Sequence, residues 1–140
     1  MKAALLDTNV LLALVWPNHQ HHALVHEWFR AEARHGWATC ALTQLGFVRL
    51  SANPAYSTAA VSPAEAATVL AALISHDSHA FWPSAAAASP ECYRHALGHQ
   101  QVNDAYLVAL ALARRGRLVT LDHRLPVHTP RPDAVFVIAS

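Results

Sequence analysis

The sequence predicts an α/β fold in which a mainly parallel sheet lies between two layers of helices, a three-layer α/β/α sandwich. Short apolar runs that resemble buried strands alternate with helical patterns along the chain. The composition, 54% hydrophobic and 14% charged residues, supplies a sizeable core. A length of 140 residues suits one compact domain. We therefore expect residues 1–140 to form a single domain.

The first half of the chain opens with a strand and a helix. Ala3–Leu6 is continuously apolar, as in a strand buried on both faces, and Asp7-Thr8-Asn9 then favours a turn or a helix N-cap. The elements expected after it are helices over Val10–Val15 and His21–Arg34, the second ended by Gly36, a strand over Trp37–Cys40 and a helix over Leu42–Leu50.

The second half begins with a well-marked helix start. Ser62 is an N-cap residue, Pro63 suits the first helical position, and Glu65 completes a capping pattern for a helix that extends to about Ser75. The elements expected after it are a strand over His79–Trp82, a weaker helix over Glu91–Ala96, an apolar helix over Asp104–Arg115 stopped by Gly116, a strand over Arg117–Leu121, a proline-marked loop, and a last strand over Val135–Ile138.

Bulk properties favour a cytoplasmic protein without a membrane segment. No basic start leads into a long apolar stretch, and the apolar run Val10–Val15 is far shorter than a bilayer requires. Cys40 and Cys92 have no metal-ligand spacing, and we interpret them as reduced thiols. Among eleven histidines, His22 and His26 share a helical face, which we interpret as a solvated surface, with a zinc site as the alternative.

The formal charge of +1 does not by itself indicate a nucleic-acid partner, but the arginines are unevenly distributed. Five of them lie in the last quarter of the chain, near Asp104 and Asp122 in sequence. A guanidinium can donate two hydrogen bonds to one phosphate. We therefore regard Arg117 and Arg124 as candidate RNA-binding residues. The alternative for the others is that Arg114 and Arg115 complement a helix C-terminus.

Three aspartates follow or begin predicted elements. Asp7 and Asp122 come directly after strands and Asp104 begins a helix, so all three can meet at the edge of a parallel sheet where its strands end. Gathered carboxylates suit Mg²⁺ or Mn²⁺, and a bound ion of this kind can support phosphodiester hydrolysis. Thr120, two residues before Asp122 on the same strand face, can orient a carboxylate. Each aspartate alone could equally be a cap or turn residue.

Three segments carry a resemblance to a known family: LLDTNVLLAL, TQLGFVRL and HQQVNDAYLVALALARRGRLVTLDHRL. In this order they resemble the PIN-domain family, specifically VapC-type ribonuclease toxins of type II toxin–antitoxin systems. The resemblance implies a Mg²⁺- or Mn²⁺-dependent endoribonuclease, an RNA substrate, a cognate antitoxin and a homodimer. By position it makes Asp7, Asp104 and Asp122 the catalytic and metal-binding residues, with Asn9 as a supporting residue beside the first.

One departure from the family pattern concerns the helix over Leu42–Leu50. The family usually places a glutamate there, whereas this chain has Gln44, and Gly46 where many relatives would carry the acid. Gln44 can offer a neutral oxygen ligand. The alternative function is therefore a catalytically weak or inactive module that binds RNA or antitoxin. An aspartate-based phosphohydrolase is disfavoured, because Asn9 replaces the second acid of its DxD pattern and Lys2 is the only lysine.

Overall fold

The computed structural model describes residues 2–139, and its centre is a five-stranded sheet in the order β3-β2-β1-β4-β5. All neighbouring strands are parallel, so the expected mainly parallel sheet is confirmed. The strands are β1 (Ala4–Leu6), β2 (Trp37–Thr39), β3 (His79–Phe81), β4 (Arg117–Thr120) and β5 (Val135–Val137).

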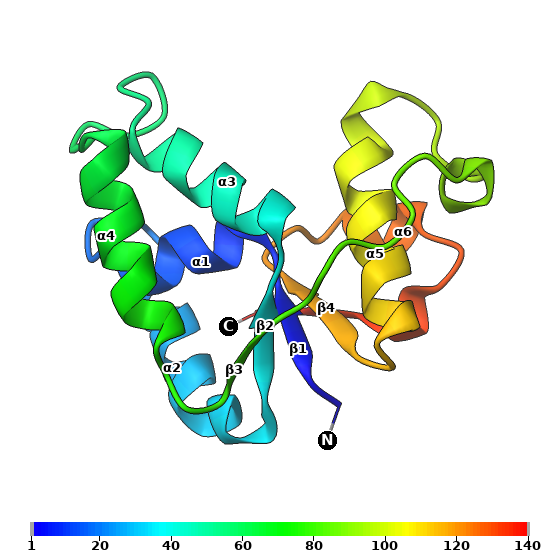
Figure 1. The fold of residues 1–140 in the computed structure, drawn as a ribbon, viewed down its shortest axis with the longest axis horizontal. Helices are drawn as coiled ribbons and strands as arrows, with labels where there is room; N and C mark the ends of the chain where they lie inside the picture. Colours follow the sequence, from blue (N-terminus) through cyan, green and yellow to red (C-terminus); the bar gives the residue numbers. More distant parts are fainter. Residues whose placement is uncertain (1, 140) are drawn as a thin grey trace.

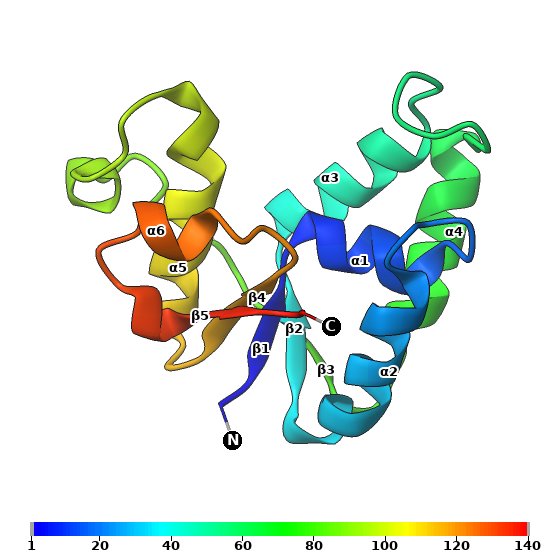
Figure 2. The ribbon, with the colours of Figure 1, turned by 180° about the vertical axis from the view of Figure 1, so that it is seen from behind.

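Helices cover both faces of this sheet, as the three-layer prediction requires. One face carries α1 (Thr8–Val15), α2 (His22–Glu32), α3 (Ala41–Ser51) and α4 (Pro63–Ile74), and the other carries α5 (Val102–Ala113) and the short α6 (Leu125–His128) (Figures 1 and 2). Successive strand residues point to opposite faces, so Leu6 packs into the core under α1–α4 while Leu5 packs into the core under α5. Both strand faces are therefore apolar.

Local signals in the sequence explain most element boundaries. Ser62 accepts a hydrogen bond from the Glu65 backbone N–H at 3.1 Å and caps α4, as predicted. Gly36 has φ +94°, a conformation that favours glycine, and it ends a 3₁₀ turn (Ala33–His35) that follows α2. Gly116 follows the left-handed residue Arg115 (φ 56°), and a Cβ on Gly116 would lie 2.7 Å from the Ala3 carbonyl oxygen.

Three predictions about helices were wrong. The segment over Glu91–Ala96 is not an α-helix: only a 3₁₀ turn over Pro90–Tyr93 forms there. The proline-marked loop contains α6, because Pro126 stands in the first helical turn, where its missing N–H costs nothing. The helix α5 begins at Val102 after a 3₁₀ turn (His99–Gln101), so Asp104 lies in its first turn and does not open it.

No helix within residues 2–139 combines the length and apolar character needed to cross a bilayer.

Candidate active site

The acidic residues lie at the point where the strand order reverses. The chain builds outward from β1 to β2 and β3, then returns to place β4 on the other side of β1. Ligands of open parallel sheets bind at such a switch point, beyond the carboxyl ends of the strands. Asp7 directly follows β1, Asp122 lies two residues beyond the end of β4, and the Asp7 backbone N–H donates to the Val119 carbonyl at 2.9 Å.

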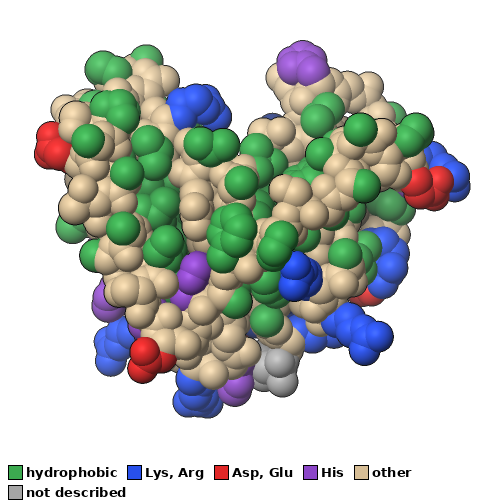
Figure 3. All heavy atoms as spheres, in the orientation of Figure 1, with side chains coloured by type: hydrophobic (Ala, Val, Ile, Leu, Met, Phe, Trp, Pro, Cys, Tyr) green, Lys and Arg blue, Asp and Glu red, His purple; other side chains and the backbone are tan. Residues whose placement is uncertain are grey.

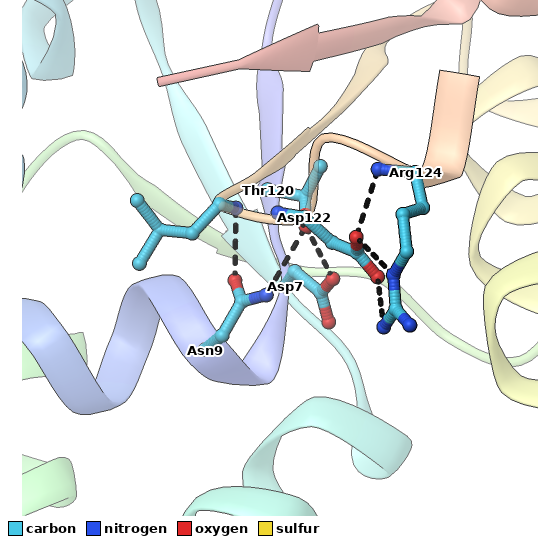
Figure 4. A network of polar contacts seen from close by, with 6 residues as sticks. Asp7, Asn9, Thr120, Asp122 and Arg124 are labelled. Carbon is cyan, nitrogen blue, oxygen red and sulfur yellow. Dashed lines mark hydrogen bonds and ion pairs between the residues drawn. The ribbon is translucent and has the colours of Figure 1, made fainter. Parts of the chain in front are cut away.

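Asp7 is both a helix cap and a buried carboxylate. Its Oδ1 accepts from the Thr8 backbone N–H at 2.7 Å, which caps α1, and its Oδ2 accepts from the Thr120 hydroxyl at 2.8 Å (Figure 4). Burial raises the pKa of Asp7, whereas the hydrogen bonds from Thr120 and Thr8 lower it and the charge of Asp122 raises it further. The net effect is a raised pKa, so a positive charge nearby would favour the ionised form of Asp7.

Thr120 and Asn9 tie the ends of β1 and β4 together. The Asn9 side-chain amide donates to Thr120 Oγ1 at 3.2 Å, and its carbonyl oxygen accepts from the Leu121 backbone N–H at 3.1 Å. Thr120 Oγ1 also accepts from the Asp122 backbone N–H at 3.1 Å. The fully buried Thr120 hydroxyl thus contacts Asp7, Asn9 and Asp122 at once (Figure 4). The structure places both residues beside the acidic centre.

Asp122 is held by Arg124. Its Oδ1 accepts from the Arg124 backbone N–H at 2.9 Å and from the guanidinium Nε at 3.2 Å, in a turn that begins just after β4. Burial raises the pKa of Asp122, but the hydrogen bonds and charge of Arg124 outweigh that effect and lower it. Asp122 is therefore the carboxylate that ionises most readily at this edge.

Asp104 reaches the same region from α5. Its pKa is raised to about 6, mainly by burial and further by the charges of Asp7 and Asp122, while Arg124 and His128 act in the opposite direction. The three carboxylates therefore repel one another across the sheet edge. A cation would relieve that repulsion, and carboxylate oxygens are the donors that Mg²⁺ and Mn²⁺ prefer, so the donor set fits such an ion.

The three carboxylates do not converge on one point as they stand. Within residues 2–139, no three His, Cys, Asp or Glu side chains are arranged to hold a single metal ion. Asp7 is turned to Thr120 and Asp122 to Arg124 (Figure 4). Magnesium usually retains several waters and takes only one or two carboxylates directly. The arrangement is therefore compatible with an ion that some of these residues contact through water.

Gln44 lies in the first turn of α3 and belongs to a separate hydrogen-bond chain. Its side-chain Nε2 donates to Thr39 Oγ1 at 2.9 Å, and Thr39 Oγ1 lies 2.8 Å from His79 Nε2. Thr39 ends β2 and is fully buried, whereas His79 begins β3 at the edge of the sheet. Our interpretation of the sequence missed Thr39 and His79, although a polar residue in each of two apolar strand runs was a signal.

Gly46 cannot carry the missing acid in this packing. A Cβ built there would lie 2.7 Å from Thr8 Oγ1 and 3.0 Å from Thr8 Cγ2, because α3 crosses closely over the start of α1 (Figure 2). Real Cβ contacts are not this short, so a side chain at Gly46 would have to displace the Thr8 side chain or move α3 away from α1. Gly46 is thus a packing residue, and Gln44 is the polar side chain that the first turn of α3 places near the sheet edge.

The two candidate arginines lie at opposite ends of the strands of the sheet. Arg124 is beside Asp122, with a side chain 82% exposed. Arg117 starts β4, where it pairs with Ala4, so it lies at the edge remote from the acidic centre. Its guanidinium contacts Glu32 at 3.7 Å and lies 4.8 Å from the centre of the Phe136 ring. The structure does not bring Arg117 to the predicted site.

The histidine cluster stays apart from this site. The rings of His22 and His26 lie 5.6 Å apart on α2, as their spacing predicts. No third ligand joins them among residues 2–139, so they do not form a closed zinc site there.

Comparisons with known proteins identify relatives over nearly the whole chain. The family model described as PIN domain matches residues 4–128. Ribonuclease VapC38 of Mycobacterium tuberculosis is 46% identical over 119 residues, which are 85% of this chain and 84% of that protein. Ribonuclease VapC39 of the same organism is 43% identical over 128 residues, which are 87% and 90% of the two chains.

Two solved structures share the fold at low sequence identity. PAE2754 from Pyrobaculum aerophilum superposes with a TM-score of 0.62 at 21% identity, covering 96% of this chain and 83% of its own. A chain of VapBC2 from Rickettsia felis, solved bound to a DNA fragment from its promoter, superposes with a TM-score of 0.59 at 13% identity, covering 90% and 92%. Sequence and fold agree: the chain belongs to the PIN-domain family and, within it, to the VapC-type proteins.

Proposed function

We propose that this protein is a metal-dependent endoribonuclease that acts as the toxin of a toxin–antitoxin pair. One observation carries the proposal: Asp7, Asp104 and Asp122 approach one another at the switch point of a parallel sheet, with the pKa of Asp104 raised to about 6. Perturbed carboxylates at such an edge are typical of catalytic sites. Relatives at 40–46% identity that bear the name ribonuclease support the reaction class.

Each residue of the site has a distinct part in this proposal. Asp7 and Asp104 would hold Mg²⁺ or Mn²⁺, and Asp122 would complete the shell directly or through water. A bound ion of this kind lowers the pKa of a coordinated water and neutralises charge on a phosphate. Thr120 fixes the Asp7 carboxylate, and Asn9 fixes Thr120. The exposed guanidinium of Arg124 can donate to a phosphate of the RNA backbone.

A binding module with little or no turnover is the second candidate function. The neutral Gln44 favours it, because no glutamate on α3 adds charge to attract the cation. Such a module would bind RNA or antitoxin, so RNA binding alone does not separate the two functions, whereas vigorous metal-dependent cleavage does.

Partners and location complete the proposal. A cognate antitoxin and a second copy of this chain are the expected protein partners. The VapC names of the relatives support the antitoxin, and the hydrophobic side chains exposed near the middle of the face in Figure 3 are compatible with a protein contact. The two cysteines, Cys40 and Cys92, are free thiols, which supports a reducing compartment such as the cytoplasm.

Cleavage of a structured RNA by the purified protein tests the proposal. Products are expected with Mg²⁺ or Mn²⁺ and not with a chelator, and Asp7→Asn should remove them. Asparagine can still cap α1, so this variant removes the charge with little loss of helix stability. Asp77→Asn is the matched control, because Asp77 is exposed and precedes β3, whereas the acidic centre lies beyond the carboxyl ends of β1 and β4. Equal cleavage by Asp7→Asn and wild type would refute the proposed site.

A further inference from the structure

A series of hydrogen bonds from the end of β2 to the start of β3 holds the side chain of Gln44. Gln44 Nε2 and His79 Nε2 both contact the single hydroxyl of Thr39, at 2.9 Å and 2.8 Å. This hydroxyl is fully buried and has these two side chains as its partners within residues 2–139. Because α3 starts where β2 ends, the chain links the sheet edge to the first helical turn (Figure 1).

The protons along these hydrogen bonds can be arranged in two ways. The two arrangements differ in whether the oxygen or the nitrogen of the Gln44 amide has no partner. The Thr39 hydroxyl has one proton. If the amide nitrogen of Gln44 donates to Thr39, then Thr39 donates to His79 Nε2. If the amide is reversed, His79 Nε2–H donates to Thr39 and Thr39 donates to the amide oxygen. The tautomer of His79 therefore decides the orientation of Gln44.

The position of the Gln44 amide selects the first direction. Its nitrogen, which can only donate, lies 2.9 Å from Thr39 Oγ1. The buried Thr39 hydroxyl then has His79 Nε2, at 2.8 Å, as its remaining partner within residues 2–139, so the hydroxyl donates and Nε2 accepts. Burial lowers the pKa of His79, which agrees with a neutral ring that can accept at Nε2. The proton order is then Gln44 N–H to Thr39 and Thr39 O–H to His79.

This order leaves the Gln44 carbonyl oxygen free. No hydrogen bond within residues 2–139 engages Oε1, and this atom is not among the buried polar atoms that lack a partner, so it reaches solvent. Leu5 pairs with Ala38, so Thr39 and Leu6 end neighbouring strands side by side, and Asp7 follows Leu6. An unrestrained glutamine amide beside carboxylates would turn its N–H groups toward them. The hydrogen bond from Gln44 Nε2 to Thr39 opposes that rotation.

We infer that Thr39 and His79 are positioning residues that hold Gln44 so that its carbonyl oxygen, and not its N–H groups, serves the cation shell at the acidic centre. The role of Gln44 toward a cation rests on the proposed function. The orientation of its amide does not depend on that function. A neutral oxygen donor suits Mg²⁺ or Mn²⁺ and adds no further negative charge beside the three aspartates.

Two measurements on the full chain test this inference. Long-range ¹H–¹⁵N NMR of the metal-free protein reports the His79 tautomer, with the signal assigned by its loss in His79→Gln. The proton is expected on Nδ1, and a proton on Nε2 would overturn the inference. Calorimetric titration with Mn²⁺ alone gives the second readout. Thr39→Val and Gln44→Ala should each weaken Mn²⁺ binding about tenfold, the usual effect of losing a residue that orients a ligand.

Controls separate positioning from general damage to the fold. The double variant Thr39→Val/Gln44→Ala should bind Mn²⁺ no more weakly than Gln44→Ala alone, and Thr39→Ser should restore the affinity. Thr43→Val removes another buried hydroxyl, whose partner within residues 2–139 is Cys40 at the start of α3, and should retain Mn²⁺ affinity. Unchanged binding in Thr39→Val refutes the positioning role. If the wild type itself binds no Mn²⁺, the proposed function fails, while the His79 tautomer still decides the orientation of Gln44.

Discussion

The Thr120 hydroxyl donates to the Asp7 carboxylate across 2.8 Å, although 113 residues separate the two in sequence. This bond joins the ends of β1 and β4 at the point where the strand order reverses. It also lowers the pKa of a carboxyl that burial otherwise raises. The same contact thus stabilises the fold and prepares Asp7 to bind a cation.

Replacing Thr120 with valine should damage metal binding more than the fold. Valine has the same shape but cannot donate to Asp7 or accept from Asn9 and Asp122, so the pKa of Asp7 should rise further. We expect Mn²⁺ affinity to fall about tenfold and RNA cleavage to fall with it, with a loss of stability of about 1–3 kcal/mol. Thr120→Ser should recover both, as measured by titration and thermal unfolding. A serine variant as poor as valine would contradict the role of the hydroxyl.

Asp104→Asn should stabilise the metal-free protein while it abolishes cleavage. The pKa of Asp104 is raised from 3.8 to about 6 in the folded state, so folding disfavours the charged form. Stability is therefore lost as the pH rises from about 3.8 through 6. The gain in Tm from the asparagine should therefore grow between about pH 4 and 6 and level off above that, whereas Asp77→Asn should show no such trend. Added Mg²⁺ should stabilise the wild type and not Asp104→Asn.

Gly46→Ala should destabilise the protein strongly for a single methyl group. Its Cβ would lie 2.7 Å from Thr8 Oγ1 and would have to displace the Thr8 side chain or move α3 away from α1. Overpacking of this kind typically costs about 1–3 kcal/mol. Gly98→Ala is the matched control, since nothing lies within 4 Å of a Cβ there. Denaturant unfolding measures both, and Thr8→Ala should partly rescue Gly46→Ala by removing the two closest atoms.

Arg124→Ala should reduce RNA affinity, whereas Arg117→Ala should reduce stability. Arg124 is exposed beside Asp122, so its loss should weaken RNA binding and reduce the dependence of affinity on salt by about one phosphate contact. Arg117 packs between Glu32 and Phe136 at the far edge, so its loss should lower Tm and leave RNA affinity unchanged. Filter binding at several salt concentrations measures the first effect. Equal loss of RNA affinity in both variants would place the RNA elsewhere.

Gln44→Glu should raise Mn²⁺ affinity and reverse the hydrogen-bond chain. A carboxylate cannot donate to Thr39, so the Thr39 hydroxyl must donate to it and His79 must donate to Thr39. We therefore expect the His79 proton to move to Nε2, which the same NMR experiment detects. An unchanged tautomer in this variant would show that Thr39 does not couple the two side chains.

The sequence by itself determined the layered parallel fold and its acidic centre. Apolar strand runs followed by helices prescribe such a sheet, and Asp7 and Asp122 follow β1 and β4, whose ends lie side by side. These patterns involve residues a few positions apart, so they can be recognised in the sequence without the structure. The resemblance to PIN domains added the reaction, which no local pattern specifies.

Only the tertiary structure decided which long-range contacts prepare the site. The bond between Thr120 and Asp7, the chain from Gln44 through Thr39 to His79, and the contact of Gly46 with Thr8 each join residues from different elements. Their existence depends on strand order, register and the crossing of α3 over α1. The same topology places Arg117 away from the acidic centre. Arg117 begins β4, whereas the acidic residues lie beyond the carboxyl ends of the strands.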